Sequence, residues 1–165
     1  MRFRRRPKVH VACLTSLAVL AGVLLTPGPA FAGKDTKACK IIKPSRMQKV
    51  LGAPVQLDPS NEPTSVAGAQ NCAFEIGPGL MEPGGGLVVV TYYSGPIVRG
   101  IAADIKTRAE PIEKGVVFDP QVEAAYVMKK QHIVGVAITY TDDTPSAEEL
   151  KPAMAELAKV GSKNA

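Results

Sequence analysis

Strand patterns dominate the second half of the chain. Residues 87–93 form a continuous β-branched and aromatic run, which predicts a strand buried on both faces. Weaker patterns bounded by turn residues predict four more strands, at 72–76, 115–118, 124–130 and 132–141. Only Gln131 separates the last two segments, so we expect a tight hairpin between them.

Two helices are predicted from their end signals. A short one extends from Pro44, which suits the first helical position, up to Gly52, which suits the turn that follows a helix. A longer one lies near the C-terminus, with Thr144 as its cap and Pro145 at its first position. We expect this second helix to end at Gly161.

A third helix is predicted between the strands. It opens at Gly95-Pro96 and repeats isoleucine every four residues, which gives it one apolar stripe. Lys106, Arg108 and Glu110 are expected on its solvent side.

This order of elements predicts a single α+β domain over residues 33–165. Adjacent strands favour antiparallel pairing, so we expect an antiparallel sheet of about five strands with helices packed on one face and one disulfide. Residues 53–71 and 77–86 are rich in proline and glycine and are interpreted as loops, the first with at most one short extended piece. Residues 33–38 are expected to form a polar, flexible lead-in.

Residues 1–32 have the three parts of a secretory signal peptide: a basic stretch, an apolar run over 9–25 and small residues before the cleavage point. Ala30 and Ala32 fit the subsites of a signal peptidase, so we expect cleavage between Ala32 and Gly33 and a secreted or extracytoplasmic protein. The alternative is an uncleaved anchor. The run is shorter than the about 20 residues of a spanning helix, so no stable membrane span is expected after cleavage.

The charge of the chain depends on this leader. The whole sequence has 20 Lys and Arg against 15 Asp and Glu, but five of the bases lie in the first eight residues and residues 1–32 contain no acid. Without the leader, 15 bases face 15 acids. A nucleic-acid partner is therefore not expected, because such binding needs a surplus of cations on the folded domain.

Loss of the leader would also remove Cys13 and leave Cys39 and Cys72. In an oxidising compartment we expect these two to form a structural disulfide. A metal pair is disfavoured because only His132 could join them, and a closed zinc site needs four ligands. A redox pair is disfavoured because redox cysteines more usually stand in a Cys-x-x-Cys motif.

Catalytic patterns are weak, and an enzyme is not favoured. Beyond the leader, His132 is the one histidine, and no Gly-x-Ser-x-Gly elbow is present, so a Ser-His-Asp site is not expected. We interpret His132 as a partly exposed structural residue at the start of a strand. Asp142-Asp143 could serve as a carboxylate pair, but its place before a helix suits dipole interactions. No catalytic residue, metal or cofactor is predicted.

Two groups of residues are candidates for a binding surface. Tyrosines on strands provide contact area at little entropic cost, although packing at the edge of the sheet explains them as well. Glycines at 84–86 lead into a strand rather than a helix, so they favour a flexible hairpin tip over a phosphate-binding loop. The candidates are Tyr92, Tyr93, Tyr126, Tyr140, Gly84, Gly85 and Gly86.

The spacing of the cysteines resembles a family of small exported proteins and lipoproteins of actinobacteria, largely of unknown function. Their pattern is Cys-x-Leu-Leu, then Leu-Gly, then Cys-x-aromatic, and the matching segments here are Ala38-Cys39-Lys40-Ile41-Ile42, Val50-Leu51-Gly52 and Asn71-Cys72-Ala73-Phe74. The resemblance implies a cell-envelope or extracellular location, a Cys39–Cys72 bridge and an α+β fold. The chain lacks the lipidation cysteine of the lipoprotein members, which favours release.

These observations predict an exported, non-enzymatic binding or interaction module of the bacterial envelope or extracellular space. Its partner is an unidentified protein or small molecule, and we expect a monomer. Two alternatives stay open: a small secreted hydrolase that uses acidic residues such as Asp142 or Asp143, and an inhibitor of a secreted enzyme that acts through the loop at 77–86.

Overall fold

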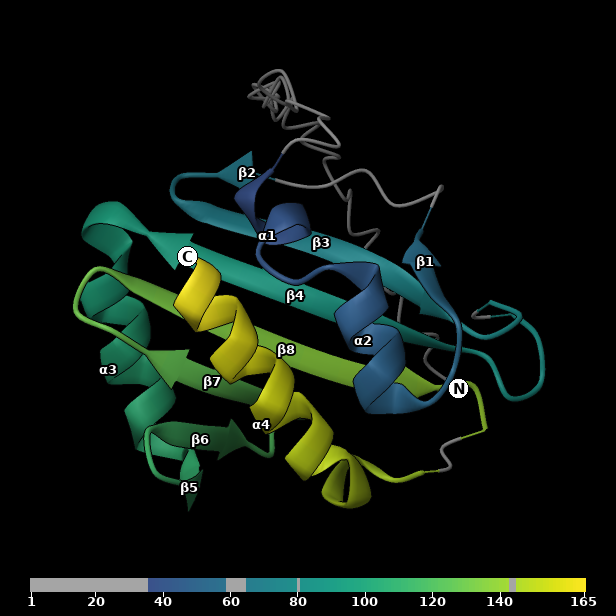
Figure 1. Ribbon diagram of the computed structural model, residues 1–165. Helices are drawn as coiled ribbons and strands as arrows, with labels where there is room; N and C mark the ends of the chain where they lie inside the picture. The colour runs from purple at the N-terminus through teal and green to yellow at the C-terminus, as the bar shows by residue number, and fades with distance from the viewer. Residues whose placement is uncertain (1–35, 59–64, 80, 143–144) are drawn as a thin grey trace, which may run out of the picture.

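The computed structural model describes residues 36–58, 65–79, 81–142 and 145–165. The predicted leader therefore lies outside the described residues. One antiparallel sheet has the strand order β1-β3-β4-β8-β7-β6-β5, and β2 pairs with β3 beside this row (Figure 1). The strands are β1 (Val55–Leu57), β2 (Ser65–Val66), β3 (Ala69–Ile76), β4 (Gly86–Ser94), β5 (Glu110–Glu113), β6 (Val116–Asp119), β7 (Ala124–Met128) and β8 (His132–Tyr140). The helices are α1 (Lys37–Lys40), α2 (Pro44–Leu51), the 3-10 turn η1 (Gly95–Ile97), α3 (Val98–Arg108) and α4 (Ala147–Asn164).

The α+β class and the antiparallel sheet are confirmed, but the predicted number of strands is wrong. Seven strands stand in the row where about five were expected. The row gains β1 and β5 at its two edges, and β2 lies off it beside β3. An edge strand needs neither length nor continuous apolar character, and β5 contains Pro111, which is tolerated because an edge strand has one unpaired side.

The two longest strands form the centre of the sheet. β4 and β8 pair in register over nine residues, from Gly86 opposite Tyr140 to Ser94 opposite His132. Alternate residues of β4 are buried, with half-buried residues between them. The prediction of a strand buried on both faces therefore holds for one face only, since the other face is partly open.

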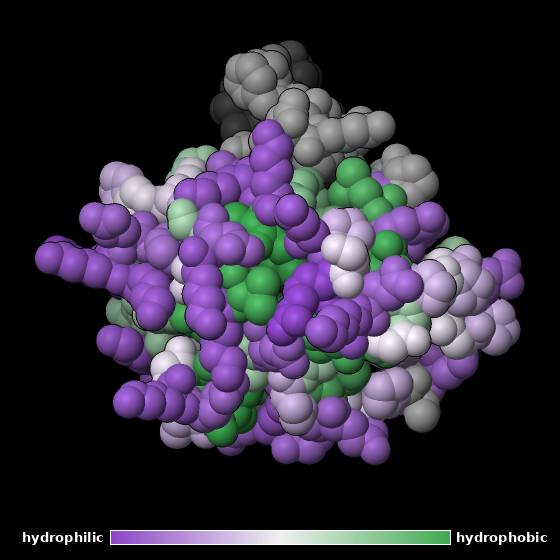
Figure 2. Space-filling model, viewed as in Figure 1, coloured by the Kyte–Doolittle hydropathy of each residue, from purple (hydrophilic) through white to green (hydrophobic). Residues whose placement is uncertain are grey.

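Three helices, α1, α2 and α4, cover one face of the sheet (Figure 1). Their apolar side chains and those of the strands below form the main core, whose largest fully buried members include Phe74, Ile41, Ile42, Met47, Ile76, Ile138, Met154 and Leu157. Figure 2 shows that hydrophilic side chains cover most of this side, with apolar ones visible between the helices. No helix among the described residues has the length and apolar character needed to cross a membrane.

Both predicted ends of the C-terminal helix are wrong. Ser146 is the N-cap of α4, and its hydroxyl and the Glu149 carboxylate form a capping box. Thr144 lies outside the described residues. At the other end, α4 passes through Gly161 to Asn164. Gly161 is needed inside the helix because a Cβ there would lie 2.9 Å from Val134 of β8, so the glycine allows close packing of α4 on the sheet.

The prediction that all helices pack on one face is also wrong, because α3 lies on the other. Val98 and Ile105 of α3 are buried with Tyr126 of β7 and Ile133 of β8 in a second, smaller cluster. Their neighbours in the strands, Val127 and Val134, belong to the main core instead, as expected when successive side chains point to opposite faces. The sheet therefore has a core on each side.

The disulfide between Cys39 and Cys72 is present and joins α1 to β3, with the two Cα atoms 5.1 Å apart. α1 begins at Lys37, within the segment expected to be a flexible lead-in, and the Lys37 N–H donates to Gln70 Oε1 at 2.8 Å. The N-terminal end of the described fold is thus bound to β3 by one covalent bond and one hydrogen bond.

Removal of the disulfide should destabilise the protein strongly. The loop-entropy model gives about 3–4 kcal/mol for a cross-link across 33 residues, so Cys39→Ala should lower the melting temperature far more than the exposed Lys49→Ala on α2. Thermal unfolding followed by circular dichroism measures both. Equal melting of the oxidised and reduced protein would contradict the expectation.

Two glycine substitutions should shift stability in opposite directions. A Cβ at Gly135 would lie 2.5 Å from Tyr126 Cε1, so Gly135→Ala should cost about 1–3 kcal/mol through overpacking. Gly100 lies in α3, and beyond the adjacent helix backbone and its chain neighbours a Cβ at this position would meet nothing within 4 Å, so Gly100→Ala should gain about 0.5–1 kcal/mol of helix propensity. Urea unfolding measures both, and unchanged stability of Gly135→Ala would contradict overpacking against the Tyr126 ring.

Candidate functional site

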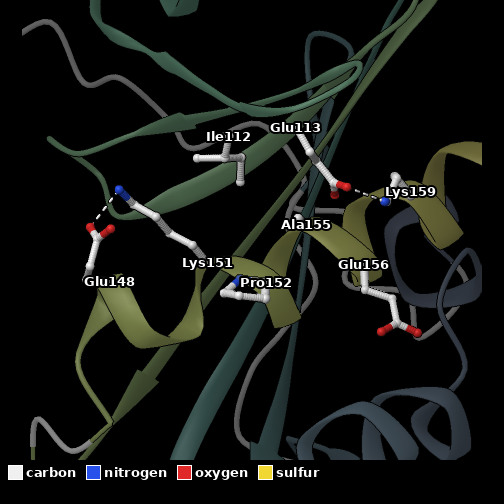
Figure 3. Close-up of a pocket in the computed structure, with 8 residues that line it drawn as sticks. All are labelled: Ile112, Glu113, Glu148, Lys151, Pro152, Ala155, Glu156 and Lys159. Atoms are coloured by element: carbon white, nitrogen blue, oxygen red, sulfur yellow. Dashed lines mark hydrogen bonds and ion pairs between the residues drawn. The ribbon is translucent and has the colours of Figure 1, made fainter.

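An open groove of about 570 Å³ lies between the edge strand β5 and α4 (Figure 3). Ile112, Pro152 and Ala155 contribute its apolar lining. Its charged side chains are engaged with one another or with neighbours. The ion pairs are Lys151 with Glu148 and Glu110, Lys159 with Glu113, and Glu156 with Arg46.

Lys151 is the most enclosed of these charges. Its side chain is 13% exposed, and the ammonium lies 4.4 Å from the centre of the Phe118 ring. Hydrogen bonds to Glu110 and then Glu148 raise the pKa of Lys151, which keeps the amine protonated. A lysine nucleophile or base needs the neutral amine, so this environment suits a structural ion pair rather than catalysis. A ligand in the groove would have to displace internal ion pairs.

A second feature is the loop between β3 and β4, called the Met81 loop below and described at residues 77–79 and 81–85. Its base is tied to the segment that follows β8. The Gly84 N–H donates to Asp142 Oδ2 at 3.0 Å, and the Gly85 carbonyl accepts from both the N–H and the hydroxyl of Thr141, at 3.0 and 3.1 Å. The loop is therefore held to the sheet by hydrogen bonds on its C-terminal side.

Further hydrogen bonds run within the Met81 loop. The Glu82 N–H donates to the Gly79 carbonyl, and the Gly85 N–H donates to the Glu82 carbonyl. At the start of the loop, the Gly77 N–H donates at 2.8 Å to the carbonyl of Pro54, which lies just before β1. Gly85 is buried, and a Cβ at this position would overlap the Gly79 backbone, so only glycine lets the two arms of the loop meet. In its described residues, 77–79 and 81–85, the predicted glycine-rich tip is held by hydrogen bonds.

This closed loop carries an apolar side chain into solvent. Met81 is 90% exposed, and the other strongly exposed large apolar residue in the described parts of the chain, Val122, is 51% exposed. Val122 lies in the turn between β6 and β7, which is at the same end of the sheet as the Met81 loop. The sequence pointed to the glycines of this loop but not to Met81, because one methionine in a glycine-rich segment has no periodic signal.

The turn that carries Val122 is fixed by Asp119, a fully buried carboxylate at the end of β6. Its Oδ2 accepts from Arg108 Nε at 2.8 Å, and its Oδ1 accepts from the Gln121 N–H at 3.0 Å. Arg108 also pairs with Asp104, and these two carboxylates raise the pKa of the guanidinium. Arg108 was expected on the solvent side of its helix, so that expectation is corrected: it joins the end of α3 to β6.

The four candidate tyrosines are divided between the two faces of the sheet. Tyr92 and Tyr140 pack with the main core, near opposite ends of the β4–β8 pair. Tyr93 and Tyr126 lie together in the cluster under α3. Burial raises the pKa of Tyr126 to about 12 and also raises that of Tyr93. The structure thus places two of the rings together and separates the other two.

His132 begins β8, as expected, and is half-buried. Its ring stacks on that of Tyr92 with the ring centres 6.1 Å apart, and its Nε2 lies 3.4 Å from Ser162 Oγ. The Asp142 carboxylate is engaged by the Gly84 N–H, whereas Asp143 lies outside the described residues. In those parts of the chain that are described, no group of three or more His, Cys, Asp or Glu could hold a metal ion.

The chain gives no match when it is compared with protein-family models, with curated proteins or with solved structures. Function must therefore be argued from the geometry above.

Loss of Arg108 should destabilise the α3–β6 contact. Arg108→Ala leaves the fully buried Asp119 without its cation, so we expect a clear fall in the free energy of unfolding, smaller than for an entirely buried pair because Arg108 is 26% exposed. Lys106→Ala, at an exposed position of the same helix, should change stability by less than about 0.5 kcal/mol. Urea unfolding measures both, and equal effects would rule out a special role for the pair.

Proposed function

We propose that this chain is an exported, non-enzymatic binding module of the bacterial envelope or extracellular space, and that it engages a protein partner through the Met81 loop. The observation that carries the proposal is the combination of a closed, hydrogen-bonded loop with a methionine at its tip that is 90% exposed. Methionine is a flexible, polarizable side chain that recurs at adaptable protein-binding surfaces, so an exposed methionine on a hydrogen-bonded loop supports a contact site.

The energetics of such a contact are favourable. Burial of one methionine side chain contributes about 1.5–3 kcal/mol, which corresponds to about a tenfold to hundredfold gain in affinity. Hydrogen bonds already hold Gly79, Glu82 and Gly85 of the loop, so these residues lose little conformational entropy on binding. The hydrogen bond that Asp142 accepts from Gly84 and the one that Thr141 donates to Gly85 therefore support binding as well as folding.

The location outside the cytoplasm rests on two independent supports. The sequence begins with a basic and then apolar leader, and the fold contains the Cys39–Cys72 disulfide. Structural disulfides persist mainly in oxidising compartments, so the bond is compatible with export.

An inhibitor of a secreted enzyme is a second candidate, favoured by the same loop. An inhibitor needs a protruding segment that holds its shape in the enzyme cleft, and the Met81 loop has internal bonds that do this. If this version is right, the captured partner is a secreted enzyme whose activity falls as the protein is added up to a one-to-one ratio.

Substitutions at the tip should separate binding from folding. Met81→Asp should weaken capture of the partner from the extracellular fraction at least tenfold, because it places a charge where an apolar side chain would be buried. Met81→Leu keeps the apolar tip and should stay within about twofold. Lys49→Gln on α2 lowers the net charge by the same one unit and controls for charge, and unchanged melting temperatures control for folding.

Several results would overturn the proposal. Capture that survives Met81→Asp, or that falls equally with Lys49→Gln, would remove the Met81 loop as the binding site. Turnover of a substrate by the purified protein that is abolished by His132→Ala would refute the non-enzymatic assignment.

A further inference from the structure

A smaller hollow lies at the opposite end of the sheet from the Met81 loop. It has a volume of about 320 Å³ and lies between the β7–β8 turn and the last turn of α4. Five residues line it: Lys129, Lys130, Gln131, His132 and Ser162. None of these residues is acidic, and each has a side chain that donates hydrogen bonds or, in the case of His132, can donate from a ring nitrogen.

The two lysines are placed by a tight turn. The Lys129 N–H donates to the His132 carbonyl at 2.8 Å, which closes the turn between β7 and β8. β7 ends at Met128, two residues earlier than predicted, so both lysines belong to the turn rather than to the strand. Both are exposed and stand next to the hollow.

His132 and Ser162 form the floor of the hollow, and contacts with neighbouring side chains hold both. His132 is stacked on Tyr92, and the Lys37 ammonium lies 5.0 Å from the centre of the Tyr92 ring. Ser162 is only 7% exposed, and its hydroxyl is 3.4 Å from His132 Nε2, at the long limit of a hydrogen bond. A nearly buried hydroxyl with such a weak partner has capacity for a better acceptor.

Among the described residues, none of those that line the hollow carries a negative charge. The Ala165 carbonyl, beyond the end of α4, accepts a hydrogen bond from Lys37 Nζ at 2.6 Å. The C-terminal end of α4 contributes about half a negative charge through its dipole, which opposes an anion. Two lysine charges outweigh that half charge, and the affinity must therefore come from Lys129 and Lys130.

We propose that this hollow binds a phosphate group. The oxygens of the group accept from the ammonium groups of Lys129 and Lys130, and the Ser162 hydroxyl and the His132 ring define the floor. Free phosphate, a phosphorylated small molecule and the headgroup of an anionic phospholipid all supply this chemistry. The site is independent of the Met81 loop, because it lies beyond the other end of the β4–β8 pair, next to His132.

Inorganic phosphate titrated into the isotopically labelled protein tests the site, with two-dimensional NMR as the readout. We expect saturable shifts of the amide signals of residues 129–132 and 162. Lys129→Gln/Lys130→Gln should weaken this binding at least tenfold, whereas Lys49→Gln/Lys106→Gln, which removes the same charge from exposed positions elsewhere, should change it less than twofold. Both double variants change exposed side chains only, and their melting temperatures show whether they fold.

Sedimentation with vesicles distinguishes the source of the phosphate group. Binding to vesicles of phosphatidylglycerol but not of phosphatidylcholine, lost in the Lys129→Gln/Lys130→Gln variant, assigns the site to a lipid headgroup. Phosphate binding without vesicle binding assigns it to a soluble ligand. The proposal is overturned if neither probe binds, or if both doubles weaken binding equally, since the latter would reflect overall charge alone.

Discussion

The antiparallel pairing of β4 with β8 is the constraint on which the rest of the molecule depends. These strands are about 40 residues apart in sequence, yet they pair without interruption over nine positions. The remaining strands of the row lie on the two sides of this pair. β3 and β1 follow beyond β4, and β7, β6 and β5 follow beyond β8. A slip of one residue would turn Val88 and Val90 away from the core under α4, so the apolar pattern fixes the register.

The register of this pair also decides where the two proposed sites lie. Gly86 stands opposite Tyr140 at one end, and the Met81 loop and the segment with Asp142 continue directly from these residues. At the other end Ser94 stands opposite His132, which lines the hollow. Hydrogen bonds between loops at one end, and ring stacking at the other, then add local order to positions already set by the backbone.

Each part of the fold could be predicted only as far as the sequence pattern behind it defines a structure. The α2 helix was found because Pro44 and Gly52 mark its two ends, and Gly52 does adopt the left-handed conformation that such an end requires. The prediction that α4 ends at Gly161 was wrong because glycine also occurs inside a helix where another element packs closely against it. The isoleucines of α3 define an apolar stripe, but a stripe has the same period whichever face of the sheet it covers. Arg108 shows the related limit: its position on the helix predicts solvent, and only the tertiary fold brings the buried Asp119 to it.

The net charge of the whole domain does not determine the charge at each place on its surface. Beyond the predicted leader, 15 bases face 15 acids, which argues against a broad basic surface of the kind that binds nucleic acid. Many of these charges are nevertheless used in pairs, as along the groove beside α4, where Lys151 and Lys159 each have a carboxylate partner. The β7–β8 turn differs because its adjacent lysines border a hollow with no acidic lining residue. Since screening in physiological salt limits the influence of an exposed charge to about 8 Å, the chemistry of such a hollow is set by its own lining and not by the neutrality of the whole domain.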